Sequence, residues 1–239
     1  MRAYFLVDLG FGDAGKGLLT DLLARERQAG LVVRYNGGAQ AGHNVVTADG
    51  RQHTFAQFGS ASFLPGVRTY LSADMVVHPT ALLAEAERLQ RLGAPDLFSR
   101  LRIHPQALLI TPFHQAANRI RELARGDGRH GSCGVGVGET YEDALRDAEG
   151  SLRAEDLCAP GRLRSKLRAI RSRKQAELAP LVASAPAGTP LAHEWEYFRR
   201  PEIIDAWIEA AAPLARAELL GGDELLADWL AHKIGRAHV

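Results

Sequence analysis

The chain has 239 residues, of which 46% are apolar and 24% charged, a composition typical of an ordinary soluble globular protein. Its formal net charge of +1 excludes a general attraction to nucleic acid or to an anionic membrane, so any basic binding surface must be local. No apolar run approaches the roughly 20 residues that cross a bilayer, and the N-terminal run is too short for a signal peptide. The two cysteines, Cys133 and Cys158, are too few for a disulfide framework. We therefore expect a cytoplasmic protein with reduced thiols.

The first part of the chain alternates short apolar runs with amphipathic segments. The runs predict strands over residues 3–9, 31–35, 53–60, 69–71, 101–103 and 108–110. The amphipathic segments predict helices over residues 16–28, 79–92 and 112–124. In the first helix, the apolar face is expected to contain Leu18, Leu19, Leu22 and Leu23. Strands that alternate with helices favour an α/β fold, with a mostly parallel, twisted sheet flanked by helices.

The composition changes after Ser151, where Arg, Leu and Ala dominate and the pattern is mostly helical. We divide the chain into an α/β core over residues 1–150 and a mainly helical subdomain over residues 151–233. The hexapeptide at residues 234–239, IGRAHV, is expected to be a non-native tail. The native sequence would then stop near Lys233.

A basic segment in this second part, residues 161–174, is expected to form a solvated amphipathic helix. Leu163, Leu167 and Ile170 would share its buried face. The basic residues would lie around the rest of the helix: Arg164, Lys166, Arg168, Arg171 and Lys174. A nucleic-acid or membrane surface is disfavoured, because no aromatic residues are interleaved with the basic ones. The second half should also bury four aromatic residues: Trp195, Tyr197, Phe198 and Trp207.

A glycine-rich segment, Gly10–Gly17, separates the first predicted strand from the first predicted helix, with the G-x-x-x-x-G-K spacing of a phosphate-binding loop. Its glycines let backbone N–H groups approach an anion, and the helix N-terminus adds partial positive charge. Lys16 can hold a phosphate as a point charge. Gly17 stands where an ordinary P-loop has the Ser or Thr that ligates Mg²⁺, so the metal needs another ligand. The carboxylate available inside the loop is Asp13.

Two further blocks accompany this loop: VRYNGGAQAGHN at residues 33–44, and HGSCGVGVGETYEDALRDAEGSLRAED at residues 130–156. Together, the three blocks resemble the signature of the adenylosuccinate synthetase family. In that family a G-D-E-G-K-G loop is followed by V-R-Y-x-G-G-x-N-A-G-H-T, and later by G-T-T-x-x-G-I-G-P-x-Y-x-D-K and G-L-R-x-x-D. The resemblance covers about the first 155 residues, in the family's order.

The resemblance implies a P-loop-like GTP-binding fold and a GTP-dependent carbon–nitrogen ligase of purine biosynthesis. IMP would be phosphorylated at its 6-oxygen with GTP and Mg²⁺, and L-aspartate would then displace the phosphate to give adenylosuccinate. Asp13 would take the N1 proton of IMP and ligate Mg²⁺ together with the backbone oxygen of Gly42. His43 would donate towards the leaving β-phosphate oxygen, and Lys16 would stabilise the transferred phosphoryl group.

The remaining site residues follow from the same resemblance. The nucleotide-binding residues would be Gly12, Gly15, Lys16, Gly17, Gly42, His43 and Asn44. The substrate-binding residues would be Asp13, Gln40, Ser132, Cys133 and Arg146. The family's homodimer implies that Arg146 reaches the IMP of the neighbouring subunit. No nucleic-acid or membrane partner is expected.

The sequence also departs from the family pattern. It has Ala14 for Glu, Gln40 for Asn, Ser132 and Cys133 for two threonines, and Thr140 for Pro. Two alternatives therefore stay open: a paralogue that joins aspartate to a different purine nucleotide, and a non-catalytic nucleotide-binding module, which would need neither Asp13 nor His43. A phage branch that aminates deoxyguanylate typically lacks the loop aspartate, so Asp13 favours an IMP-like 6-oxopurine. The family's later E-G-A-Q-G, T-T-G-R and N-K-x-D-like motifs have no match in this sequence. The aspartate site and the guanine specificity are therefore unassigned, and a third alternative is that the truncated chain is inactive.

Overall fold

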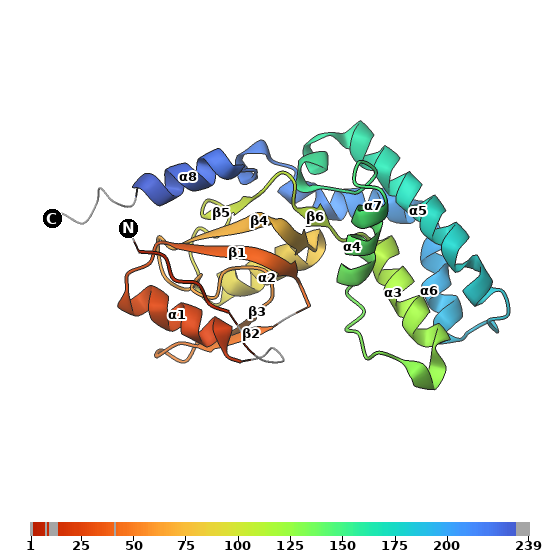
Figure 1. Cartoon of the computed structure of the whole chain (residues 1–239), viewed down its shortest axis with the longest axis horizontal. Helices are drawn as coiled ribbons and strands as arrows, with labels where there is room; N and C mark the ends of the chain where they lie inside the picture. The colour runs from red at the N-terminus through yellow and green to blue at the C-terminus, as the bar shows by residue number, and fades with distance from the viewer. Residues whose placement is uncertain (1, 8, 10–13, 41, 233–239) are drawn as a thin grey trace. The chain divides into compact units, whose positions relative to one another are not determined.

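The structure is a computed structural model that describes residues 2–7, 9, 14–40 and 42–232 (Figure 1). The chain forms two compact units. Unit 1 comprises residues 1–75, 81–107 and 216–239, and unit 2 comprises residues 76–80 and 108–215.

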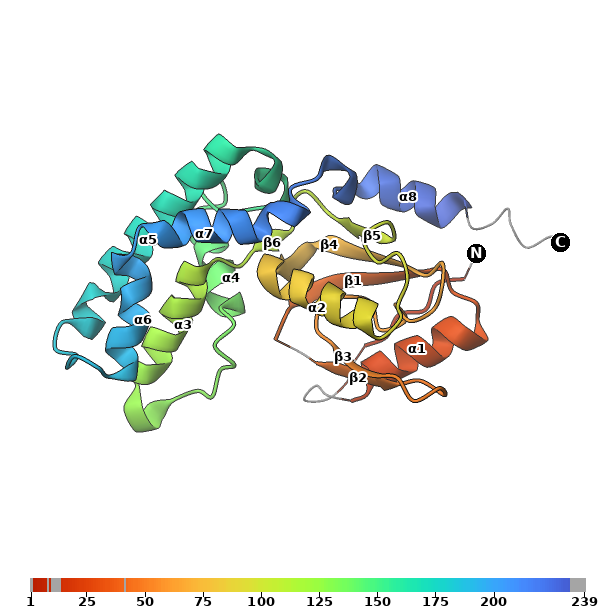
Figure 2. The ribbon, with the colours of Figure 1, turned by 180° about the vertical axis from the view of Figure 1, so that it is seen from behind.

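Unit 1 is built around a sheet with the strand order β1-β4-β5, in which β4 and β5 are parallel and Thr69 lies opposite Leu101. Its strands are β1 (Leu31–Gly38), β4 (Arg68–Val77), β5 (Leu101–Ile103) and an antiparallel hairpin of β2 (His43–Val46) and β3 (Gln52–Phe55). Its helices are α1 (Lys16–Glu26), α2 (Pro79–Arg91), the short 3₁₀ helix η4 (Ala217–Leu219) and α8 (Asp223–His232). Helix α2 lies behind the sheet in Figure 1 and in front of it in Figure 2.

Unit 2 is mostly helical. Its helices are α3 (Pro112–Ala124), α4 (Val137–Arg146), α5 (Pro160–Val182), α6 (Pro190–Arg199) and α7 (Glu202–Ala211), with 3₁₀ helices η1 (Gly126–Gly128), η2 (Ala154–Cys158) and η3 (Ala212–Leu214). Helix α3 packs against α4, α5 and α6. The short strand β6 (Leu108–Leu109) pairs in parallel with the end of β4, with Val76 opposite Leu108.

The prediction of an α/β fold with a mostly parallel sheet and flanking helices is confirmed. Helix α3 has the predicted bounds because Thr111 caps its N-terminus and Pro112 occupies its first position, where a missing N–H costs nothing. Strand β5 also has its predicted bounds, whereas the strand predicted over residues 53–60 ends at Phe55.

The predicted strand at residues 3–9 is wrong for the part that the structure describes, residues 2–7 and 9, which contains no strand. Phe5 and Leu9 are 86% and 99% exposed, so the apolar run gains no burial there to stabilise a strand. The apolar face predicted for α1 is also wrong. Its buried positions are Gly17, Asp21 and Ala24, and the exposed ones are Leu18, Leu19 and Leu22.

The basic helix α5 differs from its prediction at one position. Lys174 lies on the buried face with Leu167 and Ile170 and is fully buried, because carboxylates from neighbouring helices surround its ammonium group. Among the predicted core aromatics, Phe198 and Trp207 are buried, whereas Tyr197 is exposed. Lys233 and the predicted tail at residues 234–239 lie outside the described residues.

Candidate functional site

The first glycine loop ends in an open turn at the N-terminus of α1. Gly15 has φ +82°, a left-handed conformation that favours glycine, and a Cβ added there would meet no atom within 4 Å. No side chain caps this helix end. Lys16, the first residue of the helix, is half-buried. Uncapped N–H groups at a helix N-terminus, beside an open backbone and a lysine, suit an anion such as a phosphate.

Gly17 brings the first two predicted loops together. A Cβ at this position would lie only 2.3 Å from Cβ of His43 and 3.0 Å from its Cα, so any larger residue must displace the chain. Helix α1 and strand β2 also pack against each other. The contact gives a steric reason for glycine at the position where an ordinary P-loop carries Ser or Thr. The backbone therefore holds Gly17, the residue that follows Lys16, against His43.

The second loop leads into the β2–β3 hairpin. A Cβ at Gly42 would lie 2.6 Å from the Cγ2 atom of Thr54, which fixes this residue close to β3. Asn44 is exposed, and its Oδ1 atom accepts hydrogen bonds from Gln52 Nε2 at 3.3 Å and from Thr54 Oγ1 at 3.4 Å. Gln40 lies exposed in the preceding turn. Phosphate contact by Asn44 and substrate contact by Gln40 stay predictions.

The arginine of the V-R-Y block, Arg34, has a structural contact. Its Nη1 atom donates to the carbonyl of Ala56 at 3.1 Å, and burial lowers the pKa of its guanidinium. Glu85 accepts from the backbone N–H groups of Ala56 at 2.9 Å and Gln57 at 2.8 Å. These contacts fix the end of β3, and with it the hairpin that carries His43.

The predicted proton acceptor and metal ligand, Asp13, lies outside the described residues, as does Gly12. Within the described part of the chain, no group of three or more His, Cys, Asp or Glu residues could hold a metal ion. Mg²⁺ usually binds proteins through only one or two carboxylates and keeps water or phosphate oxygens as its other ligands. A site made of Asp13 and the backbone oxygen of Gly42, which is an exposed residue, fits that chemistry.

The third block lies in unit 2, where α3 anchors the loop that carries Ser132 and Cys133. The Oε2 atom of Glu122 accepts from the N–H groups of Gly131 at 3.0 Å and Ser132 at 3.3 Å. Asn118 Nδ2 donates to Ser132 Oγ at 3.0 Å. Burial acts to raise the pKa of Glu122, but these N–H donors and Arg125 outweigh it and hold the pKa below its ordinary value. Cys133 is an exposed free thiol.

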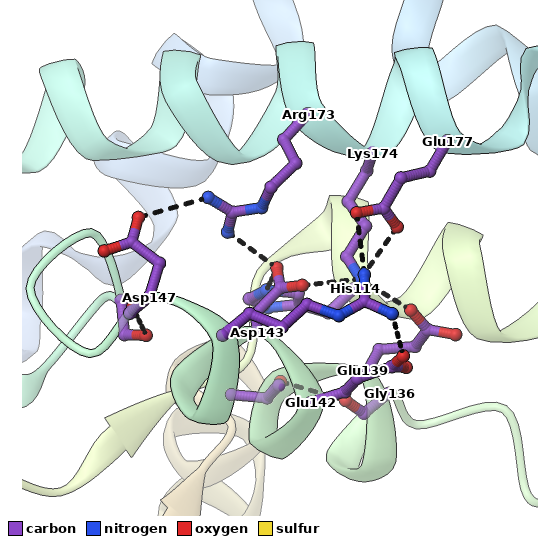
Figure 3. A network of polar contacts seen from close by, with 12 residues as sticks. His114, Gly136, Glu139, Glu142, Asp143, Asp147, Arg173, Lys174 and Glu177 are labelled. Atoms are coloured by element: carbon purple, nitrogen blue, oxygen red, sulfur yellow. Dashed lines mark hydrogen bonds and ion pairs between the residues drawn. The ribbon is translucent and has the colours of Figure 1, made fainter.

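A buried network of charged side chains joins α3, α4 and α5 in unit 2 (Figure 3). The Nζ atom of Lys174 lies 2.7 Å from Glu139 Oε2 and 2.7 Å from Asp143 Oδ1. Asp143 also accepts from Arg173 Nη2 at 2.9 Å, and its Oδ2 atom lies 3.1 Å from His114 Nε2. Burial acts to raise the pKa of Asp143, but these donors hold it well below its ordinary value. Carboxylates likewise raise the pKa of Lys174 despite its burial.

His114 in this network has the contacts of a catalytic relay but a structural role. The N–H of Thr111 donates to its Nδ1 atom at 3.1 Å, so Nε2 carries the proton and donates to Asp143. Burial lowers the pKa of His114, which keeps the ring neutral. Thr111 and His114 are each 1% exposed, so a substrate cannot reach them. The sequence reading missed this network, although Lys174 continues the apolar spacing four residues after Ile170.

Arg146, the predicted cross-subunit arginine, has partners within unit 2. Its Nη2 atom lies 2.5 Å from Glu142 Oε1, and its Nη1 atom lies 3.1 Å from Glu177 Oε1. A role at the substrate of a neighbouring subunit stays a prediction.

Comparison with known proteins identifies the family of the chain. The sequence profile of the adenylosuccinate synthetase family matches residues 5–212. The chain belongs to this family. It is 38% identical over 203 residues to the adenylosuccinate synthetase of Neisseria gonorrhoeae, covering 85% of this chain and 43% of the relative. The chain thus spans less than half the length of that relative.

Two solved structures are also similar. A fully ligated adenylosuccinate synthetase from Plasmodium falciparum matches with a TM-score of 0.63 and 19% identity, covering 93% of this chain and 47% of the other, and shows the fold. The succinoaminodeoxyadenylate synthetase of cyanophage S-2L, bound to dGMP and to dATP as an energy donor, matches with a TM-score of 0.50 and 26% identity, covering 63% of this chain and 40% of the other. No helix in the described part of the chain could span a membrane.

Proposed function

We propose that this chain supplies the N-terminal part of a GTP-dependent ligase that joins L-aspartate to IMP and forms adenylosuccinate. The observation that carries the proposal is the packing of Gly17, the residue that follows Lys16, against His43. This arrangement combines an anion-binding helix N-terminus with a side chain able to donate a proton near neutral pH.

In the proposed first step, Asp13 takes the proton from N1 of IMP, and the 6-oxygen then attacks the γ-phosphorus of GTP. The helix N-terminus and Lys16 neutralise charge on the transferred phosphoryl group, while His43 donates to the β-phosphate oxygen as the bond to it breaks. Mg²⁺, held by Asp13 and the carbonyl of Gly42, would offset charge on the phosphates.

In the second step, the amino group of L-aspartate attacks C6 and displaces phosphate, so the products are adenylosuccinate, GDP and phosphate. Ser132 and Cys133 would contact the IMP phosphate from their loop on α3. In a homodimer, Arg146 would reach the IMP of the neighbouring subunit once its contacts with Glu142 and Glu177 are released. The reaction would take place in the cytoplasm.

A different purine nucleotide remains the second candidate for the substrate. The cyanophage relative is bound to dGMP, and this chain departs from the family motif at Gln40, Ser132 and Cys133. Asp13 favours IMP, because the phage branch that aminates deoxyguanylate typically lacks this aspartate. A non-catalytic nucleotide-binding module is disfavoured because it would require neither Asp13 nor His43.

The test is an assay of adenylosuccinate formation with IMP, L-aspartate, GTP and Mg²⁺, with dGMP as the competing acceptor. It uses this chain and, in parallel, any longer reading frame that contains it. Replacing His43→Asn should lower kcat by at least about 100-fold, because a positioned proton donor contributes that much or more. The matched control, His193→Asn, alters an exposed histidine of unit 2 and should leave kcat unchanged. Nucleotide binding without product from the longer chain would contradict the substrate assignment.

A further inference from the structure

Several basic residues of helix α5 form ion pairs with nearby carboxylates. Arg162 and Lys166 both pair with Asp156. Arg173 and Lys174 pair with Asp143 in the buried network. Three further basic residues of α5 lie on one side of the helix: Arg164, Arg168 and Arg171.

These three arginines line one cavity of about 540 Å³ between α5 and α7. Its other lining residues are Ser172, Pro201, Glu202, Ile204 and Asp205. The volume falls within the range of small-molecule sites, which run from about 300 to 1,000 Å³. Arg164, Arg168 and Arg171 are spaced four and three residues apart, so their like charges repel on one helix face, which destabilises the helix unless an opposite charge lies nearby.

The acidic residues of the cavity do not neutralise all of this charge. Asp205 forms an ion pair with Arg164. Glu202 accepts from Nε of Arg200 at 2.8 Å, and Arg200 lies outside the cavity lining. Among the described residues, Arg168 and Arg171 form no ion pair, and the cavity lining has one more arginine than carboxylates.

The two remaining arginines, Arg168 and Arg171, keep their positive charge. Arg171 donates through Nε at 2.9 Å and Nη2 at 2.7 Å to the carbonyl of Phe198, which is a neutral acceptor. Arg168 is exposed and has no hydrogen-bond or ion-pair partner among the described residues. The charged residues of the lining are three arginines and two carboxylates, so the cavity has a net charge of +1. Ser172 adds a hydroxyl donor, and Pro201 and Ile204 add an apolar wall.

We propose that this cavity is a binding site for a phosphate monoester, separate from the glycine loops of the proposed ligase reaction. A phosphate monoester has a charge of about −1.5 to −2 near pH 7, and the net positive lining attracts it. Arginine binds phosphate oxygens through two parallel N–H donors, and Arg168 is free to do so. The apolar wall would contact the organic part of the ligand.

The experiment is a titration of the ¹⁵N-labelled chain with inorganic phosphate at constant ionic strength, and then with a simple phosphate monoester, glycerol 3-phosphate. We expect saturable shifts at the backbone amides of Ser172, Ile204 and Asp205, with tighter binding of the ester. Replacing Arg168→Gln should weaken this binding by about tenfold or more, because it removes a charge-assisted contact. The matched control is Arg199→Gln, which removes one exposed positive charge of unit 2 outside the cavity and should preserve binding.

Two results would overturn the proposal. The first is unchanged affinity in the Arg168→Gln variant, which would show that the cavity arginines do not hold the phosphate. The second is a set of shifts confined to residues 15–17 and 130–136, which would assign the phosphate to the glycine loops and leave the proposed ligase function intact.

Discussion

The key positions within each of the two units are stabilised by opposite kinds of contact. In unit 1, the candidate site is formed by backbone that approaches a neighbouring chain segment closely, as at Gly17 and Gly42. In unit 2, three helices are joined by charged side chains, of which Lys174 is 0% and Asp143 2% exposed. Both units expose large apolar residues. Unit 2 exposes Leu145, Leu181 and Tyr197, whereas unit 1 exposes a larger set: Tyr4, Phe5, Val7, Leu9, Leu18, Leu19, Leu22, Val33, Tyr35 and Val46.

This difference determines what each unit tolerates. A backbone contact fails when atoms are added, since no space remains for them. A buried charge network fails when one partner is removed, since the remaining charge is then desolvated without compensation. Additions should therefore damage the region around Gly17, and deletions should damage the region around Asp143.

The largest effect is expected for Asp143→Ala. It leaves the buried Lys174 with one fewer carboxylate and should lower the free energy of unfolding by about 3–5 kcal/mol. Urea unfolding followed by tryptophan fluorescence measures this loss. In a Trp229→Phe background, the signal comes from Trp195 and Trp207, which both lie in unit 2.

The matched control for this prediction is Glu142→Ala, the preceding residue of α4. Glu142 also has an ion-pair partner, Arg146, but its side chain is 44% exposed, so its removal should cost less than about 1 kcal/mol. A second variant, Asp143→Leu with Lys174→Met, should recover much of the loss because it removes both charges. Equal losses in Asp143→Ala and Glu142→Ala would contradict the importance of burial.

A smaller effect is expected in unit 1 for Gly17→Ser. The new Cβ would overlap His43, and the resulting shift of α1 or β2 should cost about 1–3 kcal/mol. Gly138→Ser is the matched control, because Gly138 is likewise the second residue of a helix, but a Cβ there meets nothing within 4 Å. Hydrogen exchange should show lost protection of the β2 amides in the first variant alone. Unchanged protection of β2 in Gly17→Ser would show that the close contact does not constrain the site.

The predictions from sequence succeeded where local signals are sufficient. The amphipathic pattern over residues 112–124 located α3, and an apolar run bounded β5. They failed where a contact with a residue distant in sequence determines the local structure. The apolar run at residues 3–9 reads as a strand, yet a strand requires a neighbour to pair with. Lys174 was assigned to the solvated face because a lysine counts as polar, whereas its partners on α4 precede it by about 30 residues.

The candidate site shows the same limit. The order of the glycine blocks was visible in the sequence, but the contact between Gly17 and His43 joins positions that no helical or strand periodicity relates. Glu122 and Asn118, which hold the loop of Ser132, belong to an ordinary amphipathic helix pattern. Their role follows only from the fold of the loop back onto α3.

The smallest expected effect is a pH dependence of the stability of unit 2. Burial lowers the pKa of His114, so between its folded pKa and its ordinary value of about 6.5 the unfolded chain binds a proton that the folded chain does not. The free energy of unfolding should therefore fall as the pH drops below about 6.5, by at most about 1.4 kcal/mol per pH unit. Asp143 does not contribute in this range, because its lowered pKa affects stability only below the ordinary pKa of a carboxyl group. Urea unfolding at pH 7, 6 and 5, in the Trp229→Phe background, measures the slope.

The variant His114→Gln tests the assignment of this slope. It should be less stable at pH 7, because Gln cannot reproduce both hydrogen bonds of the ring, but its stability should decline less between pH 7 and 5. His78 lies in the same unit and also has a pKa lowered by burial, so part of the slope should remain. Replacing both histidines should remove it. An undiminished slope in the double variant would mean that the pH dependence of unit 2 arises outside its buried histidines, and that His114 is not the neutral member of the network.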